Sequence, residues 1–180
     1  MKKFLMFALM CVLTIGFVTG CGNNDEEVDK KDDAETQSEY TKHSSNGFSF
    51  SYLKSWGETE NISTDNNIGF SLILPDRESV LRVNRESLDS NLNLSDYYNT
   101  FIDALLNGIG VDPDDITTLD KNYNGMDVRL IRYNYEGNVI ERIVYPPKSM
   151  YGYSIQYTAR GEIFNNAYSE VEKVYNSLEF

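Results

Sequence analysis

Cysteine and histidine are almost absent from this chain of 180 residues, which contains two Cys and one His. Cys11 lies inside an apolar N-terminal run and is expected to be removed with it, so Cys21 would remain as the only thiol. One Cys cannot form an internal disulfide or a CxxC motif. A transition-metal site built from His and Cys ligands is therefore excluded from the expected globular part.

Recognisable catalytic motifs are missing as well: the sequence has no GxGxxG, GxxxxGK[ST], HExxH or GxSxG pattern. We interpret His43 as a solvated linker residue, because a catalytic base must lie inside a structured cleft. The acids Glu60, Glu78, Glu86 and Glu141 are scattered and indicate no glycosidase-like pair. We expect a protein that is not an enzyme. An enzyme with an unrecognised carboxylate site is an alternative.

Basic residues are scarce: 16 Lys and Arg stand against 28 Asp and Glu, for a formal net charge of −12. Without residues 1–20 the charge is −14, and residues 40–180 carry −8. An acidic domain is a poor partner for nucleic acid or for an anionic lipid surface. We therefore expect no nucleic-acid partner.

The first twenty residues have the pattern of an export signal. Lys2 and Lys3 precede an uncharged, apolar run from residue 4 to residue 18. As a helix that run would span about 22 Å, which is short of a hydrocarbon core of about 30 Å. The segment therefore predicts a cleaved signal peptide over residues 1–20 and no permanent membrane span.

The signal ends in Val18-Thr19-Gly20-Cys21. This tetrapeptide resembles the lipobox of bacterial lipoproteins, in which an aliphatic residue and two small residues precede the acylated Cys. The resemblance implies that Cys21 carries the lipid and that the protein is anchored to the extracytoplasmic face of the cell membrane. The alternative is an ordinary signal peptide followed by a chance Cys.

Residues 21–39 differ in composition from everything that follows. They are rich in Asp, Glu and small polar residues, and Val28 is their only large apolar side chain. Such a segment cannot bury enough surface to offset its ordering entropy. It predicts a disordered acidic tether that precedes one globular domain over residues 40–180.

Apolar periodicity in residues 40–180 predicts an α+β fold, with helices packed on the faces of an antiparallel sheet. Ser95 is the expected N-cap of the first helix and Gly108 its C-terminal stop, and a second helix is expected from about 162 to 177. Pro146-Pro147 is expected to end a strand. The expected strands cover residues 48–52, 68–74, 80–85, 116–123, 128–135, 139–145 and 151–158.

Three segments resemble PsbP-like domains: Gly47-Phe48-Ser49-Phe50-Ser51-Tyr52 with Ser55-Trp56, a helix that begins Asp96-Tyr97-Tyr98, and Tyr153 to Ala159 followed by a helix that ends at Phe180. The resemblance implies the Mog1/PsbP-like α/β/α sandwich, which generally serves as a protein-binding scaffold. Leu53 stands where the family often has Pro. Photosynthetic members help to retain manganese and calcium, but no metal-ligand motif of theirs is found here.

Two surfaces are candidate sites. Asp112, Asp114 and Asp115 form the densest carboxylate cluster, which is a weak calcium hypothesis or a solvated turn. The second candidate is a partner surface made of the tyrosine row Tyr151, Tyr153 and Tyr157 together with Arg129 and Arg132. The alternative is that the tyrosines belong to the core and that the arginines pair with acids.

The function expected from these observations is a lipid-anchored, non-enzymatic adaptor or ligand-binding lipoprotein with an envelope protein as partner. A calcium-responsive module that uses the Asp112–Asp115 loop is the alternative. No cofactor is expected apart from calcium.

Overall fold

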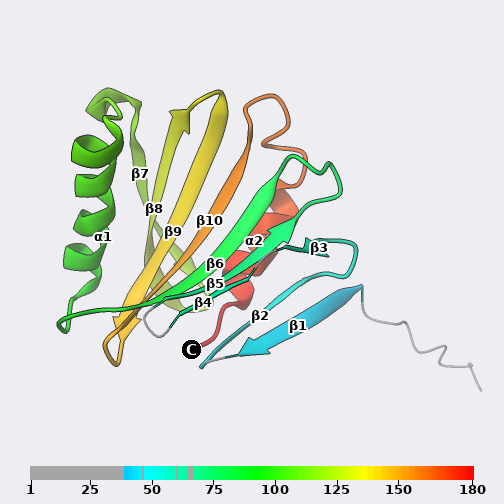
Figure 1. Cartoon of the computed structure of the whole chain (residues 1–180), viewed down its shortest axis with the longest axis horizontal. Helices are drawn as coiled ribbons and strands as arrows, with labels where there is room; N and C mark the ends of the chain where they lie inside the picture. Colours follow the sequence, from blue (N-terminus) through cyan, green and yellow to red (C-terminus); the bar gives the residue numbers. More distant parts are fainter. Residues whose placement is uncertain (1–38, 46, 60, 65–66) are drawn as a thin grey trace, which may run out of the picture. The chain divides into compact units, whose positions relative to one another are not determined.

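The computed structural model describes residues 39–180 except 46, 60, 65 and 66 (Figure 1). The predicted signal, lipobox and tether therefore lie outside the described residues, apart from Glu39. Residues Gln37–Phe180 form one compact unit. Within the described part, no helix is long and apolar enough to cross a membrane.

Most of the unit is an antiparallel sheet of eight strands in the order β3-β5-β6-β10-β9-β8-β7, with β4 paired to β5, and a separate hairpin of β1 and β2 (Figure 1). Strands that are distant in sequence, β6 and β10, are therefore neighbours in the middle of the sheet. The strands are β1 (Tyr40–Ser45), β2 (Phe48–Leu53), β3 (Gly57–Glu58), β4 (Ile62–Ser63), β5 (Asn67–Ile73), β6 (Val80–Ser87), β7 (Thr117–Tyr123), β8 (Met126–Tyr135), β9 (Asn138–Lys148) and β10 (Tyr151–Arg160).

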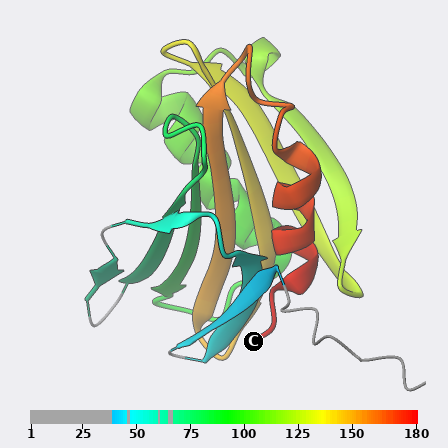
Figure 2. The same ribbon diagram turned by 90° about the vertical axis from the view of Figure 1, so that its right-hand side faces the viewer.

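Two helices lie on opposite faces of the sheet. Figure 2 shows α1 (Leu94–Asp103) behind the sheet, with α2 (Tyr168–Ser177) and the β1–β2 hairpin in front of it. The chain end is held to the hairpin, because Ser49 and Glu179 exchange two backbone hydrogen bonds of 2.9 Å. These layers confirm the predicted fold class, an antiparallel sheet with helices on its faces.

The face toward α2 carries the larger hydrophobic core. Alternate residues of each strand point to it, because side chains in a strand change face at every step. Leu81, Val83, Ile143, Ile155 and Tyr157 are each at most 1% exposed. They pack with the hairpin and with Val171, Val174, Tyr175 and Leu178 of the C-terminal segment.

The face toward α1 carries a smaller core. Tyr97 and Tyr98 of α1 pack with Ile131, Ile140 and Val144 of β8 and β9. Both cores are drawn wholly from residues 48–180. The unit therefore contains all the apolar packing of the described chain and can be studied as a fragment that begins at Gln37.

The ends of α1 differ from the prediction. Asn93, and not Ser95, is the N-cap, since its side chain accepts a hydrogen bond of 2.9 Å from the Asp96 amide. The chain then continues through a π-helical turn (Ala104–Ile109), and Gly110, at φ 77°, ends it in place of Gly108. Only glycine adopts that left-handed conformation at little cost.

The second helix is shorter than predicted: turns occupy residues 161–166, and α2 begins at Tyr168. Pro146 and Pro147 do not end β9, which continues to Lys148. The pairing with β10 shifts register between Tyr151 and Tyr153. At such a bulge the ladder is interrupted, so residues without an amide hydrogen are tolerated.

His43 is not a linker residue, which corrects the sequence interpretation. It lies in β1, and its ring centroid is 4.0 Å from that of Phe70, with Phe48 and Phe50 also in contact. Burial lowers the pKa of His43, and the charge of Glu58 partly opposes that shift.

Candidate functional site: a polar pocket on the open face

The α1 side of the sheet is polar where α1 does not cover it. Helix α1 packs mainly on β9 and β8, and in Figure 1 it lies at the β7 end of the sheet, away from β5 and β6. Here the open face means the α1-side surface of β5, β6, β10 and the adjoining part of β9. Its residues alternate with the core residues of the other face.

Cross-strand register sets the polar residues of the open face in rows. Arg82 of β6 and Arg142 of β9 both pair with Gln156, which lies between them on β10. Ser71 of β5 extends this row beyond Arg82. In the next row Asn84 pairs with Gly69 and with Ser154. Residues as far apart in sequence as Arg82 and Gln156 are thus immediate neighbours.

A pocket of about 290 Å³ lies over these rows. The strands form its floor and Phe101 of α1 forms a wall. Its volume is just below the range for small-molecule sites, which begins at about 300 Å³. The pocket is lined by Asn67, Ile68, Gly69, Arg82, Asn84, Arg85, Glu86, Phe101, Arg142, Ser154 and Gln156.

The two arginines of the row have neutral partners. Arg82 Nε donates to Ser71 Oγ at 3.2 Å. Arg142 donates to the side-chain oxygen of Gln156, and its guanidinium lies 4.4 Å from the centroid of the Phe101 ring. Among the described residues, neither arginine has a carboxylate oxygen within 4.0 Å. The remaining N–H donors of both guanidiniums are therefore not engaged by acids.

The charges around Arg142 act in both directions. Burial lowers the pKa of the Arg142 guanidinium, and the positive charge of Arg82 lowers it further, while Tyr133, Tyr97 and Glu86 oppose that shift. The Glu86 carboxylate itself accepts a hydrogen bond of 2.6 Å from Tyr97 Oη. The pocket lining thus includes Arg82 and Arg142, whose charges repel each other, and one carboxylate that is held by a tyrosine. A third arginine of the lining, Arg85, lies with its guanidinium 4.3 Å from the centroid of the Tyr151 ring.

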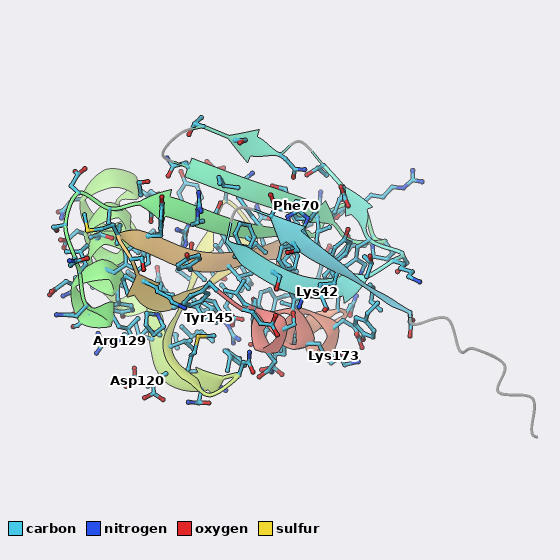
Figure 3. The ribbon with its side chains drawn as sticks, turned by 90° about the horizontal axis from the view of Figure 1, so that it is seen from below. Lys42, Phe70, Asp120, Arg129, Tyr145 and Lys173 are labelled. Atoms are coloured by element: carbon cyan, nitrogen blue, oxygen red, sulfur yellow. The ribbon has the colours of Figure 1, made fainter. Side chains whose placement is uncertain are left out.

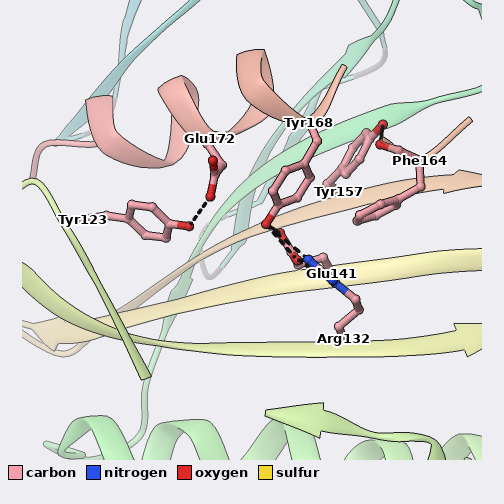
Figure 4. A network of polar contacts seen from close by, with 7 residues as sticks. All are labelled: Tyr123, Arg132, Glu141, Tyr157, Phe164, Tyr168 and Glu172. Atoms are coloured by element: carbon pink, nitrogen blue, oxygen red, sulfur yellow. Dashed lines mark hydrogen bonds and ion pairs between the residues drawn. The ribbon is translucent and has the colours of Figure 1, made fainter. Parts of the chain in front are cut away.

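On the α2 side of the sheet, Arg132 is paired with an acid (Figure 4). Glu141, which is 0% exposed, accepts hydrogen bonds from Arg132 and from the Tyr168 hydroxyl. For Arg132, burial lowers the pKa of the guanidinium, but the hydrogen bond and charge of Glu141 outweigh that effect and raise it. Tyr123 donates to Glu172 at 3.2 Å in the same layer. This cluster is internally paired, so we assign it to stability.

The predicted acidic site is a turn. Asp112 Oδ1 accepts a hydrogen bond of 3.0 Å from the Asp114 amide and caps the short helix η2 (Pro113–Asp115). Asp112, Asp114 and Asp115 are exposed. In the part of the chain that the structure describes, no three His, Cys, Asp or Glu side chains gather to hold a metal. Calcium binding at this loop stays a prediction from the sequence alone.

The predicted tyrosine and arginine surface is not one surface. Tyr153 and Tyr157 are 5% and 0% exposed and belong to the α2-side core, with Tyr151 half-buried beside them. Arg132 points to the α2 side. Arg129 points to the other side, where its Nε lies 3.5 Å from Asp120 Oδ1 (Figure 3). The partner-surface interpretation is wrong for Tyr153 and Tyr157, because core packing buries them.

The lipobox residues Val18, Thr19, Gly20 and Cys21 lie outside the described residues. Sequence reasoning missed the pocket. Strand alternation could have placed Arg82 on the face opposite Leu81 and Val83. It could not have shown that β6 and β9 flank β10.

Comparison with known proteins supports the fold. The solution structure of cyanobacterial PsbP (CyanoP) from Synechocystis sp. PCC 6803 has a TM-score of 0.54 and 13% identity, over 78% of this chain and 92% of that one. The fold is PsbP-like. A crystal structure from Bacteroides thetaiotaomicron VPI-5482 has a TM-score of 0.50 and 15% identity over 78% of this chain. The match spans 48% of that chain, about half of its length.

No protein-family description and no curated protein matches the sequence. The PsbP-like domain is therefore identified by its fold, and its site must be interpreted from its own residues.

Proposed function

We propose that this protein is a lipid-anchored, extracytoplasmic lipoprotein whose PsbP-like domain is a non-enzymatic adaptor or ligand-binding module. The sequence supports the anchor, through the lipobox that ends at Cys21. The observation that carries the binding role is the pocket on the open face, which combines hydrogen-bonding side chains and two guanidiniums that have no acidic partner among the described residues.

The pocket offers recognition without an evident nucleophile–base pair. The hydroxyl in its lining comes from Ser154, and Ser71 outside the lining accepts a hydrogen bond from Arg82. Neither serine has a histidine beside it, because His43 packs against Phe70 on the other side of the sheet. A serine needs an adjacent base to act as a nucleophile. The arrangement therefore favours binding over covalent catalysis.

The anchor is tested by lipid labelling in cells. The wild-type protein should incorporate labelled fatty acid and remain with membranes, whereas Cys21→Ala should be unlabelled. Normal labelling of Cys21→Ala would show that the acceptor is wrong.

Binding by the open face is tested by photo-crosslinking of the anchored protein in intact cells. A benzophenone amino acid replaces Asn84 on the open face or, as a control, exposed Asn176 on α2. Adducts are read by gel for a protein partner and by intact mass for a small ligand. An adduct at position 84 and none at 176 is expected. The absence of any adduct at 84 would contradict the proposal.

A further inference from the structure

We propose that the pocket between Arg82 and Arg142 binds a small dianion, a dicarboxylate or a phosphate monoester, in a site whose floor is Gln156 and Asn84. This inference rests on the proposed binding function and names its ligand class. It depends on three observations: the register, the partners of the guanidiniums, and the charge of the site compared with that of the domain.

The register places the two arginines in the same row and on the same face of the sheet. They flank Gln156 on adjacent strands, so their Cα atoms are about 10 Å apart, which is two inter-strand spacings. Long side chains that start at that separation can hold one dianion between them. Asn84, in the next row, makes no side-chain hydrogen bond to any described residue and adds a donor and an acceptor beside it.

The guanidiniums present a fork of donors that matches carboxylate and phosphate oxygens. Each of the two uses a neutral oxygen of Ser71 or Gln156, which satisfies a hydrogen bond but supplies no opposite charge. Glu86 acts on Arg142 through its charge and not through a direct contact. An anion between Arg82 and Arg142 would offset, by its opposite charge, both their mutual repulsion and the cost of burying Arg142. An arginine that served only stability would be expected to pair with an acid, as Arg132 does with Glu141.

The charge balance selects a small ligand over a large anionic surface. Residues 40–180 carry a formal charge of −8, so a nucleic acid or an anionic bilayer would be repelled by the domain as a whole. A small dianion would meet the local field of Arg82 and Arg142, with Arg85 also in the lining, and Glu86 is the one acid among the lining residues. The Phe101 wall gives an apolar contact for the carbon part of such a ligand.

The test is calorimetric titration and thermal unfolding of the fragment that begins at Gln37, with Trp56, the single tryptophan, as the fluorescent probe. The probes are succinate, inorganic phosphate and uncharged succinamide at constant ionic strength. Saturating dianion should raise Tm by several degrees. Binding of succinate alone assigns a dicarboxylate, and binding of phosphate alone assigns a phosphate monoester. Binding of both supports the shared chemistry.

Variants of the pocket distinguish binding at this site from a general electrostatic attraction of anions to the domain. Arg82→Gln and Arg142→Gln should each weaken binding at least tenfold. Arg142→Met keeps packing on Phe101 and serves if Arg142→Gln unfolds. Arg160→Gln is the charge-matched control, because Arg160 pairs with Glu78 at the surface, and it should bind like wild type.

Three results would overturn the proposal: no heat or Tm shift with either dianion, an equal effect of succinamide, or an equal loss in Arg160→Gln. If no dianion binds while position 84 still crosslinks a protein in cells, the ligand inference fails and the proposed binding function stands.

Discussion

The two faces of the sheet use the same residue type in opposite ways, and adjacent residues of β9 show this most clearly. Glu141 points to the α2 side, where it is fully buried and paired with Arg132. Arg142 points to the α1 side, where its hydrogen bond goes to a neutral amide. A buried acid fixes the position of the first arginine, whereas the second has no acid within 4.0 Å among the described residues. The difference separates a structural ion pair from the site that we propose for a ligand.

The largest expected effect is a difference in unfolding free energy between two variants with the same substitution, Arg132→Met and Arg142→Met. Arg132→Met leaves a fully buried carboxylate with only Tyr168, and it should cost about 3 kcal/mol, since the partly exposed Arg132 puts it at the lower end of the range for broken buried pairs. Arg142→Met leaves no orphaned charge and should cost at most about 1 kcal/mol, through its contact with Phe101. Urea unfolding followed by Trp56 fluorescence measures both. Equal costs would remove the distinction between the faces.

Gly152 tests how closely α1 packs on the sheet. A Cβ on Gly152 would lie 2.4 Å from Cζ of Tyr97, which is buried, so the ring would have to move. Gly152→Ala should destabilise the domain by about 1–3 kcal/mol through overpacking. It should also weaken dianion binding, because a Glu86 carboxylate that loses the Tyr97 hydroxyl is free to compete with the dianion for the guanidiniums.

The matched control is Gly161→Ala, where the nearest atom to a Cβ is Val139 Cγ2 at 3.8 Å. Urea midpoints of both variants give the comparison. A Gly152→Ala domain as stable as Gly161→Ala would mean that α1 is more loosely packed than the structure indicates.

Removal of the N-cap of α1 should have a smaller effect on stability, on the α1 side of the sheet. Asn93→Ala removes the hydrogen bond to the Asp96 amide and should cost about 1 kcal/mol. Ser95→Ala removes only an exposed 3.3 Å contact with Arg129 and should be nearly neutral. Thermal unfolding of the two variants under one condition decides between them. A larger loss for Ser95→Ala would restore the sequence-based assignment of the cap.

The smallest expected effect is a pH dependence on the α2 side. Burial lowers the folded-state pKa of His43 below its ordinary value of 6.5, so the unfolded chain binds the proton more readily. Stability should therefore fall as the pH drops from 7.5 through about 6.5, and level off below the folded-state pKa. Asp76, Glu170 and Glu179 have lowered pKa values, so their stabilisation is lost only at more acidic pH.

The measurement is the urea midpoint of the wild type and His43→Phe between pH 5.5 and 7.5. The variant should show a flatter dependence than the wild type. Identical slopes would show that His43 does not titrate differently in the folded domain.

Local patterns predicted much of the fold. The alternation of Leu81 and Val83 with Arg82 identified β6, and the apolar spacing around Tyr98 identified α1. The cap was misassigned because Asn93 and Ser95 are both good cap residues and only the path of the chain decides between them. The Pro146-Pro147 break was wrong because a bulge against β10 accommodates the prolines, and that depends on a partner strand.

The pocket could not be predicted in the same way. Arg82, Gln156 and Arg142 come together only through the strand order β6-β10-β9 and its register. Each residue alone is an ordinary polar position on a strand. His43 was misplaced for a related reason: its aromatic environment is supplied partly by Phe70, which is 27 residues away.

The central claim is that the open face, and not the α2 face, is the binding side of the domain. The most direct test is to follow backbone amide resonances of the ¹⁵N-labelled fragment from Gln37 as succinate or phosphate is added. The account predicts saturable shifts confined to Ser71, Arg82, Asn84, Arg142, Gln156 and their neighbours, and absent in Arg82→Gln. Shifts that concentrate around Arg132, Glu141 and Tyr168, or that are the same in Arg82→Gln, would contradict it.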